Sequence, residues 1–397
     1  MFKIIAPILA LLGAIVYQLE LPRMVRIFIG VGHTAEPLSS FPYTCRRIYH
    51  KGMEACEDMW LSQSTRQLFL ACSDPLARAQ WMPNMLHFNV SGRGLNDAIV
   101  VVDIDEMSPD KLKPRVLETP GFPGTNGDGR LHLVGLTGVD DSDGNVRLWV
   151  INAKPSVDPM SGEFSDNSKV GGNSTVELFR AGPYASSLDH VKTFAHSQIA
   201  TPNNVAPVGD QGNSFYFTND HGVTKTGIMG HLAPVLGGGD VSFCDDTTCK
   251  EVARGLKFPN GLAKGHDGLI YVPSSILGVI DVFEPQSNGN LTKVDQIDVG
   301  YSLDNLAVDS DGEIFAAVIT DTFKFFAANN DPYGKDAPTA AVRIHKGLDG
   351  RYKVAKVIED SLAEVLPAST AVVHDPKTGK LFFSGVSSPF VGVCEPK

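Results

Sequence analysis

Carboxylate and carboxamide side chains occur at four separate places in this chain, each at the start of a short apolar segment. They are Glu57-Asp58, Asn203-Asn204, Asn260 and Asp304-Asn305. Their oxygen atoms are the ligands that Ca²⁺ prefers, and a calcium ion needs several of them at once. Zn²⁺ would instead require His or Cys, and neither stands at these places. If the fold brings the four places together, we therefore expect a calcium site.

The segments that begin at these places belong to a repeat. Each copy has a short apolar stretch, a polar turn rich in Asp, Gly and Asn, and a second apolar stretch. The clearest copies are residues 261–275, 305–319 and 371–385, and looser copies are residues 57–73, 135–152 and 204–220. Asn and Asp alone could simply form turns. Their recurrence at the same position of four copies favours a shared site instead.

Six copies, starting near residues 57, 135, 203, 260, 305 and 370, indicate the fold. Spacings of roughly 45 to 78 residues match one four-stranded blade per copy. A β-sandwich would also have many short strands, but not six similar units. We therefore predict an all-β chain that forms a six-bladed β-propeller, with the start of each inner strand facing a central tunnel.

Composition agrees with this fold and excludes one class of partner. The chain has 397 residues, of which 43% are hydrophobic and 20% charged, with 39 Gly and 25 Pro. Many Gly and Pro residues favour short strands and tight turns. The formal net charge is −11 and no basic block is present, which argues against binding to nucleic acid.

The N-terminus has the features of an export signal. Lys3 precedes an apolar run from Ile4 to Tyr17, which is short for a membrane-spanning helix and close to the hydrophobic region of a signal peptide. No clear cleavage site precedes Leu21. Residues 1–30 are therefore expected to be a signal peptide or an uncleaved signal-anchor helix, and residues 31–397 the propeller. Either form directs the chain to the secretory pathway, to be secreted or held at a membrane or lipid surface.

Six cysteines in an exported chain indicate disulfides. Cys45 precedes the first repeat and Cys394 lies three residues from the end, so a bridge between them would close the ring. Such a long loop would stabilise the fold by roughly 4 to 5 kcal/mol in the chain-entropy model. Two further pairings are geometric guesses, Cys56 with Cys72 and Cys244 with Cys249. Three glycosylation sequons, at Asn89, Asn173 and Asn290, suit the same compartment.

Common catalytic motifs are absent from the sequence. The chain has no G-x-S-x-G nucleophile elbow, no H-E-x-x-H, no P-loop and no G-x-G-x-x-G after a strand. An esterase with a serine nucleophile is therefore unsupported.

Several segments together resemble the serum paraoxonase/arylesterase family. They are CRRIYHKGMEACEDMWL (45–61), STVELFR (174–180), PNNVAPVG (202–209), FYFTNDHG (215–222), GLKFPNGLA (255–263), SLDNLAVD (302–309) and VGVCEPK (391–397). The resemblance follows the chain in order from about residue 40 to its end. It implies a six-bladed propeller that hydrolyses lactones or aryl esters and holds two calcium ions in its tunnel.

The resemblance also assigns ligands to each ion. The catalytic calcium would be bound by Glu57, Asn203, Asn260, Asp304 and Asn305 and would polarise the substrate carbonyl. A second, structural calcium would involve Asp58, the backbone carbonyl of Leu136, and Asn204. Animal members of the family have an acid at the last of these positions.

The chain departs from the family at its catalytic histidines. Val134 and Ala153 stand where the animal enzymes have a His pair. We consider three replacements as general base: His132, His221, or a carboxylate of the metal site itself. The missing pair also supports an alternative, a calcium-binding propeller without turnover. A gluconolactonase-like or strictosidine-synthase-like propeller is a third possibility, although the terminal cysteines and the NDH and DN motifs favour the paraoxonase type.

Overall fold

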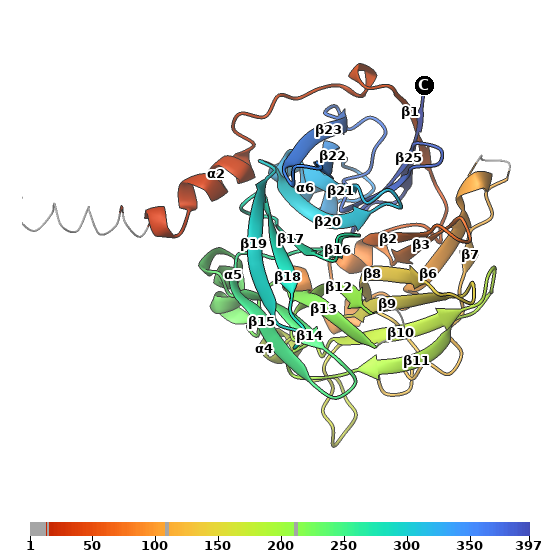
Figure 1. Ribbon diagram of the computed structural model, residues 1–397. Coiled ribbons are helices and arrows are strands. Elements are labelled where there is room, and N and C mark those ends of the chain that lie inside the picture. The colour runs from red at the N-terminus through yellow and green to blue at the C-terminus, as the bar shows by residue number, and fades with distance from the viewer. Residues whose placement is uncertain (1–12, 14–15, 108–110, 210–212) are drawn as a thin grey trace, which may run out of the picture.

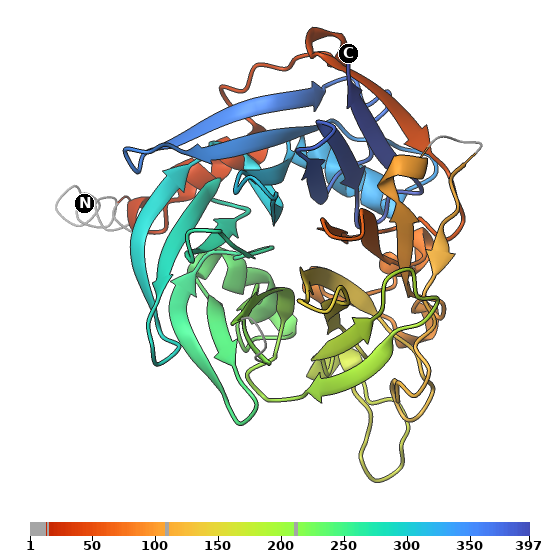
Figure 2. The same ribbon diagram turned by 45° about the vertical axis from the view of Figure 1, so that its right-hand side comes forward.

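The computed structural model describes residues 13, 16–107, 111–209 and 213–397. Its main feature is six four-stranded antiparallel sheets arranged around one axis (Figures 1 and 2). The first strands of successive sheets contact one another in a closed ring, β2, β8, β12, β16, β20 and β24. The predicted six-bladed β-propeller is therefore confirmed.

Five blades follow the chain from the inner strand outward. Their strands are β2 (Asp58–Ser62), β3 (Gln67–Cys72), β6 (Ala98–Asp103) and β7 (Arg115–Val116); β8 (Leu133–Asp140), β9 (Val146–Asn152), β10 (Thr175–Ala181) and β11 (Asp189–Phe194); β12 (Pro202–Val208), β13 (Ser214–Asn219), β14 (Gly239–Cys244) and β15 (Cys249–Leu256); β16 (Ala263–Lys264), β17 (Ile270–Ser274), β18 (Val279–Pro285) and β19 (Leu291–Asp298); β20 (Ser302–Val308), β21 (Ile314–Ile319), β22 (Thr339–Lys346) and β23 (Tyr352–Asp360). The sixth blade contains β24 (Ala371–Asp375), β25 (Lys380–Ser384), β26 (Val391–Pro396) and, at its outer edge, β1 (Tyr43–Ile48).

Short helices and one small hairpin lie between strands of the same blade, except for one helix, α2, that precedes β1. They are α2 (Leu21–Ile29), α3 (Pro75–Arg78), α4 (Asn167–Val170), α5 (Gly227–Leu236), α6 (Thr322–Asn330), and a hairpin of β4 (Trp81–Met82) and β5 (His87–Phe88). Four single-turn 3₁₀ segments complete the set, at Leu38–Ser40, Pro83–Met85, Val90–Gly92 and Ile104–Glu106.

The repeat in the sequence corresponds to the inner hairpin of each blade. In the fifth blade the turn between β20 and β21 is closed by Asp309, whose Oδ1 accepts the backbone N–H groups of Asp311 and Glu313. Gly312 in this turn has a φ of 82°, which favours glycine. Every residue of β21 is buried, because the neighbouring blades cover both of its faces.

Ring closure uses both ends of the propeller. β1 pairs with β26 from Tyr43 opposite Pro396 to Ile48 opposite Val391. In this register Cys45 faces Cys394, and the two form a disulfide. The other cysteines form bridges between Cys56 and Cys72 and between Cys244 and Cys249.

The predicted N-terminal anchor falls largely outside the described residues, since the apolar run covers residues 4–17. The described part of the chain contains no helix long and apolar enough to cross a membrane. It does contain α2, which packs on the propeller at the fourth blade. Met24 and Ile27 are buried, and Arg23 binds Asp298 (2.6 Å) and the carbonyl oxygen of Leu277 (2.6 Å).

Candidate functional site

The predicted ligand residues meet at the centre of the ring. Glu57 directly precedes β2, Asn203 and Asn204 lie in β12, Asn260 precedes β16, and Asp304 and Asn305 lie in β20. All six are at least 92% buried, as is Asp58. Hydrogen bonds across the axis connect three blades: Asn305 Nδ2 donates to Glu57 Oε1 (2.9 Å), and Asn204 Nδ2 donates to Asn305 Oδ1 (3.2 Å).

Irregular strand pairing directs these side chains into the tunnel. The register between β12 and β13 shifts between Pro202 and Val205, and that between β20 and β21 shifts between Leu303 and Leu306. In both places the two residues that are skipped are the predicted ligands. β-Bulges of this kind re-aim side chains and are frequent beside functional sites.

Two cavities lie at opposite ends of the ligand cluster, and we call them the near and the far cavity. The near cavity has a volume of about 620 Å³ and is lined by Glu57, Asn203, Asn260 and Asp304 together with apolar residues of α2, α5 and α6. The far cavity has a volume of about 580 Å³ and reaches Asp58, Leu136 and Asn204. Asn305 lines neither and lies between them.

The acids of the cluster carry more negative charge than their surroundings balance. Burial raises the pKa of Glu57 to about 7, and burial together with the nearby Glu57 carboxylate raises the pKa values of Asp58 and Asp304. The buried Arg78 interacts more strongly with Asp97 than with Glu57. A bound cation would remove this imbalance.

The near cavity also contains oxygen atoms suited to a cation. Among the described residues, Glu57 Oε2 and Asn203 Oδ1 are buried and have no hydrogen-bond partner. Buried acceptors of this kind are costly unless something binds them. The described residues contain no group of three or more His, Cys, Asp or Glu side chains arranged for a metal ion. The set at Glu57 and Asp304 therefore relies on carboxamides, which suit a hard ion such as Ca²⁺.

His221 lies in the near cavity and forms a pair with its neighbour. Its Nδ1 is 2.7 Å from Asp220 Oδ1, so Nδ1 carries the proton and donates it to the carboxylate. Asp220 Oδ2 accepts a hydrogen bond from Asn84 Nδ2 (2.6 Å), and Asn84 also donates to the carbonyl oxygen of Pro202 (3.0 Å). Among the described residues Nε2 of His221 has no hydrogen-bond partner. Its lone pair is therefore free to accept a proton from a molecule in the cavity.

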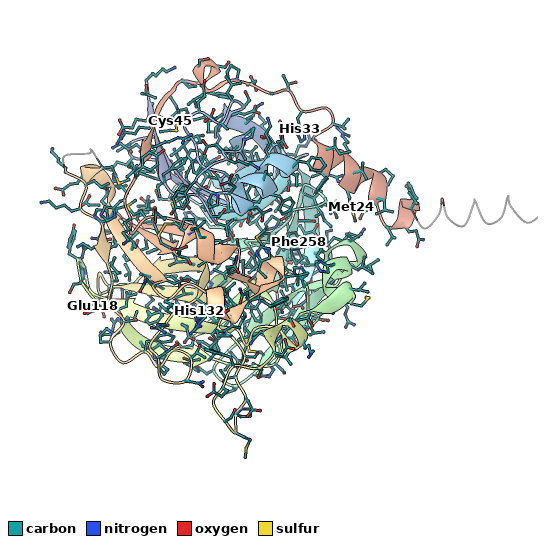
Figure 3. All side chains as sticks on the ribbon, turned by 180° about the vertical axis from the view of Figure 1, so that it is seen from behind. Met24, His33, Cys45, Glu118, His132 and Phe258 are labelled. Carbon is teal, nitrogen blue, oxygen red and sulfur yellow. A yellow bond between two sulfur atoms is a disulfide. The ribbon has the colours of Figure 1, made fainter. Side chains whose placement is uncertain are left out.

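His132 is not brought to either cavity. Its backbone N–H donates to Asn152 Oδ1 (2.9 Å), and its carbonyl oxygen accepts the backbone N–H of Ala153 (2.7 Å). These two hydrogen bonds hold the backbone of His132 at the end of β9. Both ring nitrogens are buried without a partner among the described residues, and burial lowers the pKa of His132 to about 4. Figure 3 labels His132, and also Met24 and Phe258, which do line the near cavity.

Val134 and Ala153, at the positions of the missing histidine pair, are both buried in one apolar cluster. Neither position therefore offers an acid–base group. It did not indicate Asp220 or Asn84 as functional residues. Asp220 is adjacent to His221 in the NDH motif and could have been found from it, whereas Asn84 lies 136 residues away and has no local signal.

Comparisons with known proteins identify the family. A family model described as Arylesterase matches residues 165–385. The chain is 30% identical over 285 residues to serum paraoxonase/arylesterase 2 of Gallus gallus, covering 70% of this chain and 72% of that protein. It is 27% identical over 310 residues to serum paraoxonase/arylesterase 1 of Homo sapiens, covering 77% and 78%.

A solved structure titled glucose dehydrogenase has a TM-score of 0.50 at 12% identity and covers 89% of this chain and 98% of that one. At that identity it supports the fold alone. The family model, in contrast, matches more than half of this chain. The alignments to the two paraoxonases cover more than two thirds of the length of each relative. The chain therefore belongs to the paraoxonase/arylesterase family.

Proposed function

We propose that this protein is a calcium-dependent carboxylic ester hydrolase that acts on aryl esters or lactones in the near cavity. The observation that carries the proposal is the pair of unpartnered buried oxygens, Glu57 Oε2 and Asn203 Oδ1, at the base of a cavity that also contains the Asp220–His221 pair. The names of the sequence relatives supply the substrate class, since they include arylesterases and a serum paraoxonase/lactonase 3 of Mus musculus.

The residues of the chain divide the chemistry between them. Glu57, Asn203, Asn260, Asp304 and Asn305 would hold the calcium ion. When bound, such an ion polarises an ester carbonyl and stabilises negative charge on its oxygen. The acyl or aryl group of the substrate packs against apolar side chains of the same cavity, including Met82, Phe28 and Val386.

His221 is the proposed general base. Asp220 fixes the tautomer that leaves Nε2 unprotonated, and Asn84 in turn fixes Asp220. Nε2 removes a proton from the attacking water, and the imidazolium returns it to the leaving alkoxide or phenoxide. Asp220 stabilises the charged imidazole between these steps. This pair would replace the histidines that the chain lacks at Val134 and Ala153.

The test compares two Asp-paired histidines. Turnover of phenyl acetate and of γ- and δ-lactones is measured with calcium and after chelation, for the wild type, Asp304→Ala, His221→Gln and His374→Gln. His374 contacts Asp309 at 2.7 Å, the same distance as His221 to Asp220, but lines the far cavity. It is therefore a matched control.

Turnover should require calcium and be lost in Asp304→Ala. His221→Gln should lower kcat by roughly 100- to 10,000-fold, and His374→Gln should leave it unchanged. Turnover that survives chelation would exclude the calcium mechanism, and full activity of His221→Gln would exclude this base. Calcium binding with no turnover on any substrate would instead support the second candidate, a calcium-binding propeller without activity, which the missing histidine pair favours.

We further propose that the chain enters the secretory pathway and is glycosylated. Asn89, Asn173 and Asn290 are all exposed, and all six cysteines are in disulfides. Both features suit an oxidising compartment.

Contact with a membrane or lipid surface is proposed for the rim of the near cavity. Three helices expose apolar side chains there: Val25, Phe28 and Ile29 of α2, Ile228 and Leu232 of α5, and Phe323 of α6. Phe28 and Phe323 contact each other, with ring centroids 5.2 Å apart, which joins α2 to α6. An exposed apolar rim of this kind suits an apolar surface.

A further inference from the structure

The second predicted calcium position differs from the first in how its oxygen atoms are used. It comprises Asp58, Leu136 and Asn204, which come from β2, β8 and β12 and are buried. Unlike Glu57 and Asn203 in the near cavity, neither Asp58 nor Asn204 leaves a buried side-chain oxygen or nitrogen without a hydrogen-bond partner among the described residues.

Both oxygens of Asp58 accept N–H groups of the chain itself. Oδ1 accepts the backbone N–H of Met59 (2.8 Å), and Oδ2 accepts the backbone N–H of Leu136 (3.0 Å) and Nδ2 of Asn204 (2.8 Å). Leu136 therefore directs an N–H donor at this carboxylate. These three N–H donors favour the ionised form of the carboxylate, and they occupy the oxygen atoms that a cation would otherwise bind.

The orientation of the Asn204 carboxamide follows from its neighbours. Oδ1 accepts the backbone N–H of Val205 (2.7 Å), while Nδ2 faces Asp58 Oδ2 and Asn305 Oδ1. The reverse orientation would place Oδ1 against two other oxygens and Nδ2 against a backbone N–H, with every contact repulsive. Nδ2 of Asn204 is thus fixed as a donor to Asp58.

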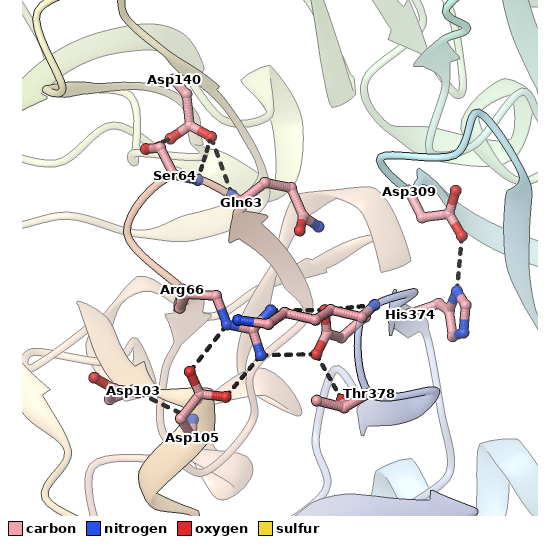
Figure 4. Close-up of polar contacts among 11 residues, drawn as sticks. Gln63, Ser64, Arg66, Asp103, Asp105, Asp140, Asp309, His374 and Thr378 are labelled. Carbon is pink, nitrogen blue, oxygen red and sulfur yellow. Dashed lines mark hydrogen bonds and ion pairs between the residues drawn. The ribbon is translucent and has the colours of Figure 1, made fainter.

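Among the described residues that line the far cavity, no carboxylate is free to bind a cation that approaches from that side. Asp140 accepts a hydrogen bond from Ser62. It also accepts from Ser64 and from the backbone N–H of Gln63, and Asp309 accepts one from His374 (Figure 4). The same cavity is lined by Lys264 and His266, for which no ion pair exists among the described residues. In the part of this lining that the structure describes, the side chains without an ion pair are therefore basic.

We infer that this protein binds one cation in its tunnel and that the carboxamide nitrogen of Asn204 takes the place of a second cation beside Asp58. The inference rests on the proposed calcium site in the near cavity and sets its stoichiometry. The inference predicts that Asn204→Asp would create a second cation site. In this variant two carboxylates, at positions 58 and 204, would face each other, and the N–H donor that now lies between them would be gone.

The test counts bound calcium by equilibrium dialysis with calcium alone, on the wild type, Asn204→Asp and Asn329→Asp. Asn329 is also a buried carboxamide, whose Oδ1 accepts the hydroxyl of Ser387, and so controls for a buried charge elsewhere. We expect one ion per chain in the wild type and in Asn329→Asp, and two in Asn204→Asp. Chelation should lower the Tm of Asn204→Asp by more than that of the wild type.

Two ions in the wild type, or no additional ion in Asn204→Asp, would overturn the inference. No ion in the wild type together with one in Asn204→Asp would overturn the count of one ion and exclude the calcium site of the proposed function, while upholding the role of Asn204. If Asn204→Asp does not fold, Asp58→Asn provides the test. It should keep the wild-type stoichiometry, and loss of an ion would show that Asp58 is a ligand.

Discussion

At the scale of single residues, His132 makes a prediction that does not depend on catalysis. Burial, with a smaller contribution from the positive charge of Arg93, lowers its pKa from 6.5 to about 4. Between these values the unfolded chain binds a proton that the folded protein does not. The free energy of unfolding therefore falls as the pH falls from 6.5 to 4, by about 3 kcal/mol in total.

His132→Leu should remove this dependence. Denaturant unfolding at pH 7 and pH 4.5 should show a smaller loss of stability in the variant than in the wild type. The control is His196→Leu, because His196 is exposed. This variant should lose as much stability between pH 7 and pH 4.5 as the wild type does. Parallel pH profiles for the wild type and His132→Leu would contradict the burial of a neutral imidazole.

His132 also shows why the direction of a side chain could not be predicted from the sequence alone. Strand alternation places residues 132 and 134 on one face, which made His132 a candidate base. The register between β8 and β9 shifts between Leu133 and Leu136, so alternation does not hold there. The polar residues at the starts of the inner strands were easier to predict, because four of the six copies of the repeat have them at the same position.

At the scale of secondary-structure elements, the inner strands begin close to where the repeat placed them. The predicted starts near 57, 203 and 370 compare with Asp58, Pro202 and Ala371. The bulges in β12 and β20 could not be predicted, because a bulge is defined by the partner strand as well as by its own sequence. They nevertheless decide which side chains reach the tunnel.

Close packing between these inner strands makes Gly261 a sensitive position. A Cβ at this residue would overlap Oδ1 and Cα of Asn305. Gly261→Ala should therefore displace Asn305 from Glu57, lower turnover by at least tenfold and lower stability by about 1–3 kcal/mol. Activity assays and denaturant unfolding measure both effects. Gly182→Ala, where the added atom would make only an ordinary contact with Asn145, is the control, and equal behaviour of the two variants would show that Asn305 is not positioned in this way.

At the scale of the whole molecule, closure of the ring depends on contacts between the two ends of the propeller. Arg66, in the first inner hairpin, binds Asp375 of the last blade (2.8 and 2.9 Å). It also binds Asp105 of its own blade (2.7 and 3.0 Å), as Figure 4 shows. On the outer edge, β1 and the Cys45–Cys394 bridge join the same two ends. The terminal cysteines were identifiable from the sequence because closure of a propeller brings the two ends of the chain together. Arg66 was not, since only the folded ring places it beside Asp375.

The stability lost on removal of the Cys45–Cys394 disulfide, which closes the ring, can be compared with that lost on removal of the Cys244–Cys249 disulfide, which constrains only a short loop. The Cys45–Cys394 bridge spans 349 residues and the Cys244–Cys249 bridge spans 5. In the chain-entropy model the first stabilises the fold by about 6 kcal/mol and the second by about 2 kcal/mol. Denaturant unfolding of the two double Cys→Ser variants under non-reducing conditions should reproduce this order. Equal losses would mean that β1 stays paired with β26 without covalent help, and that strand pairing, with Arg66, is sufficient to keep the ring closed.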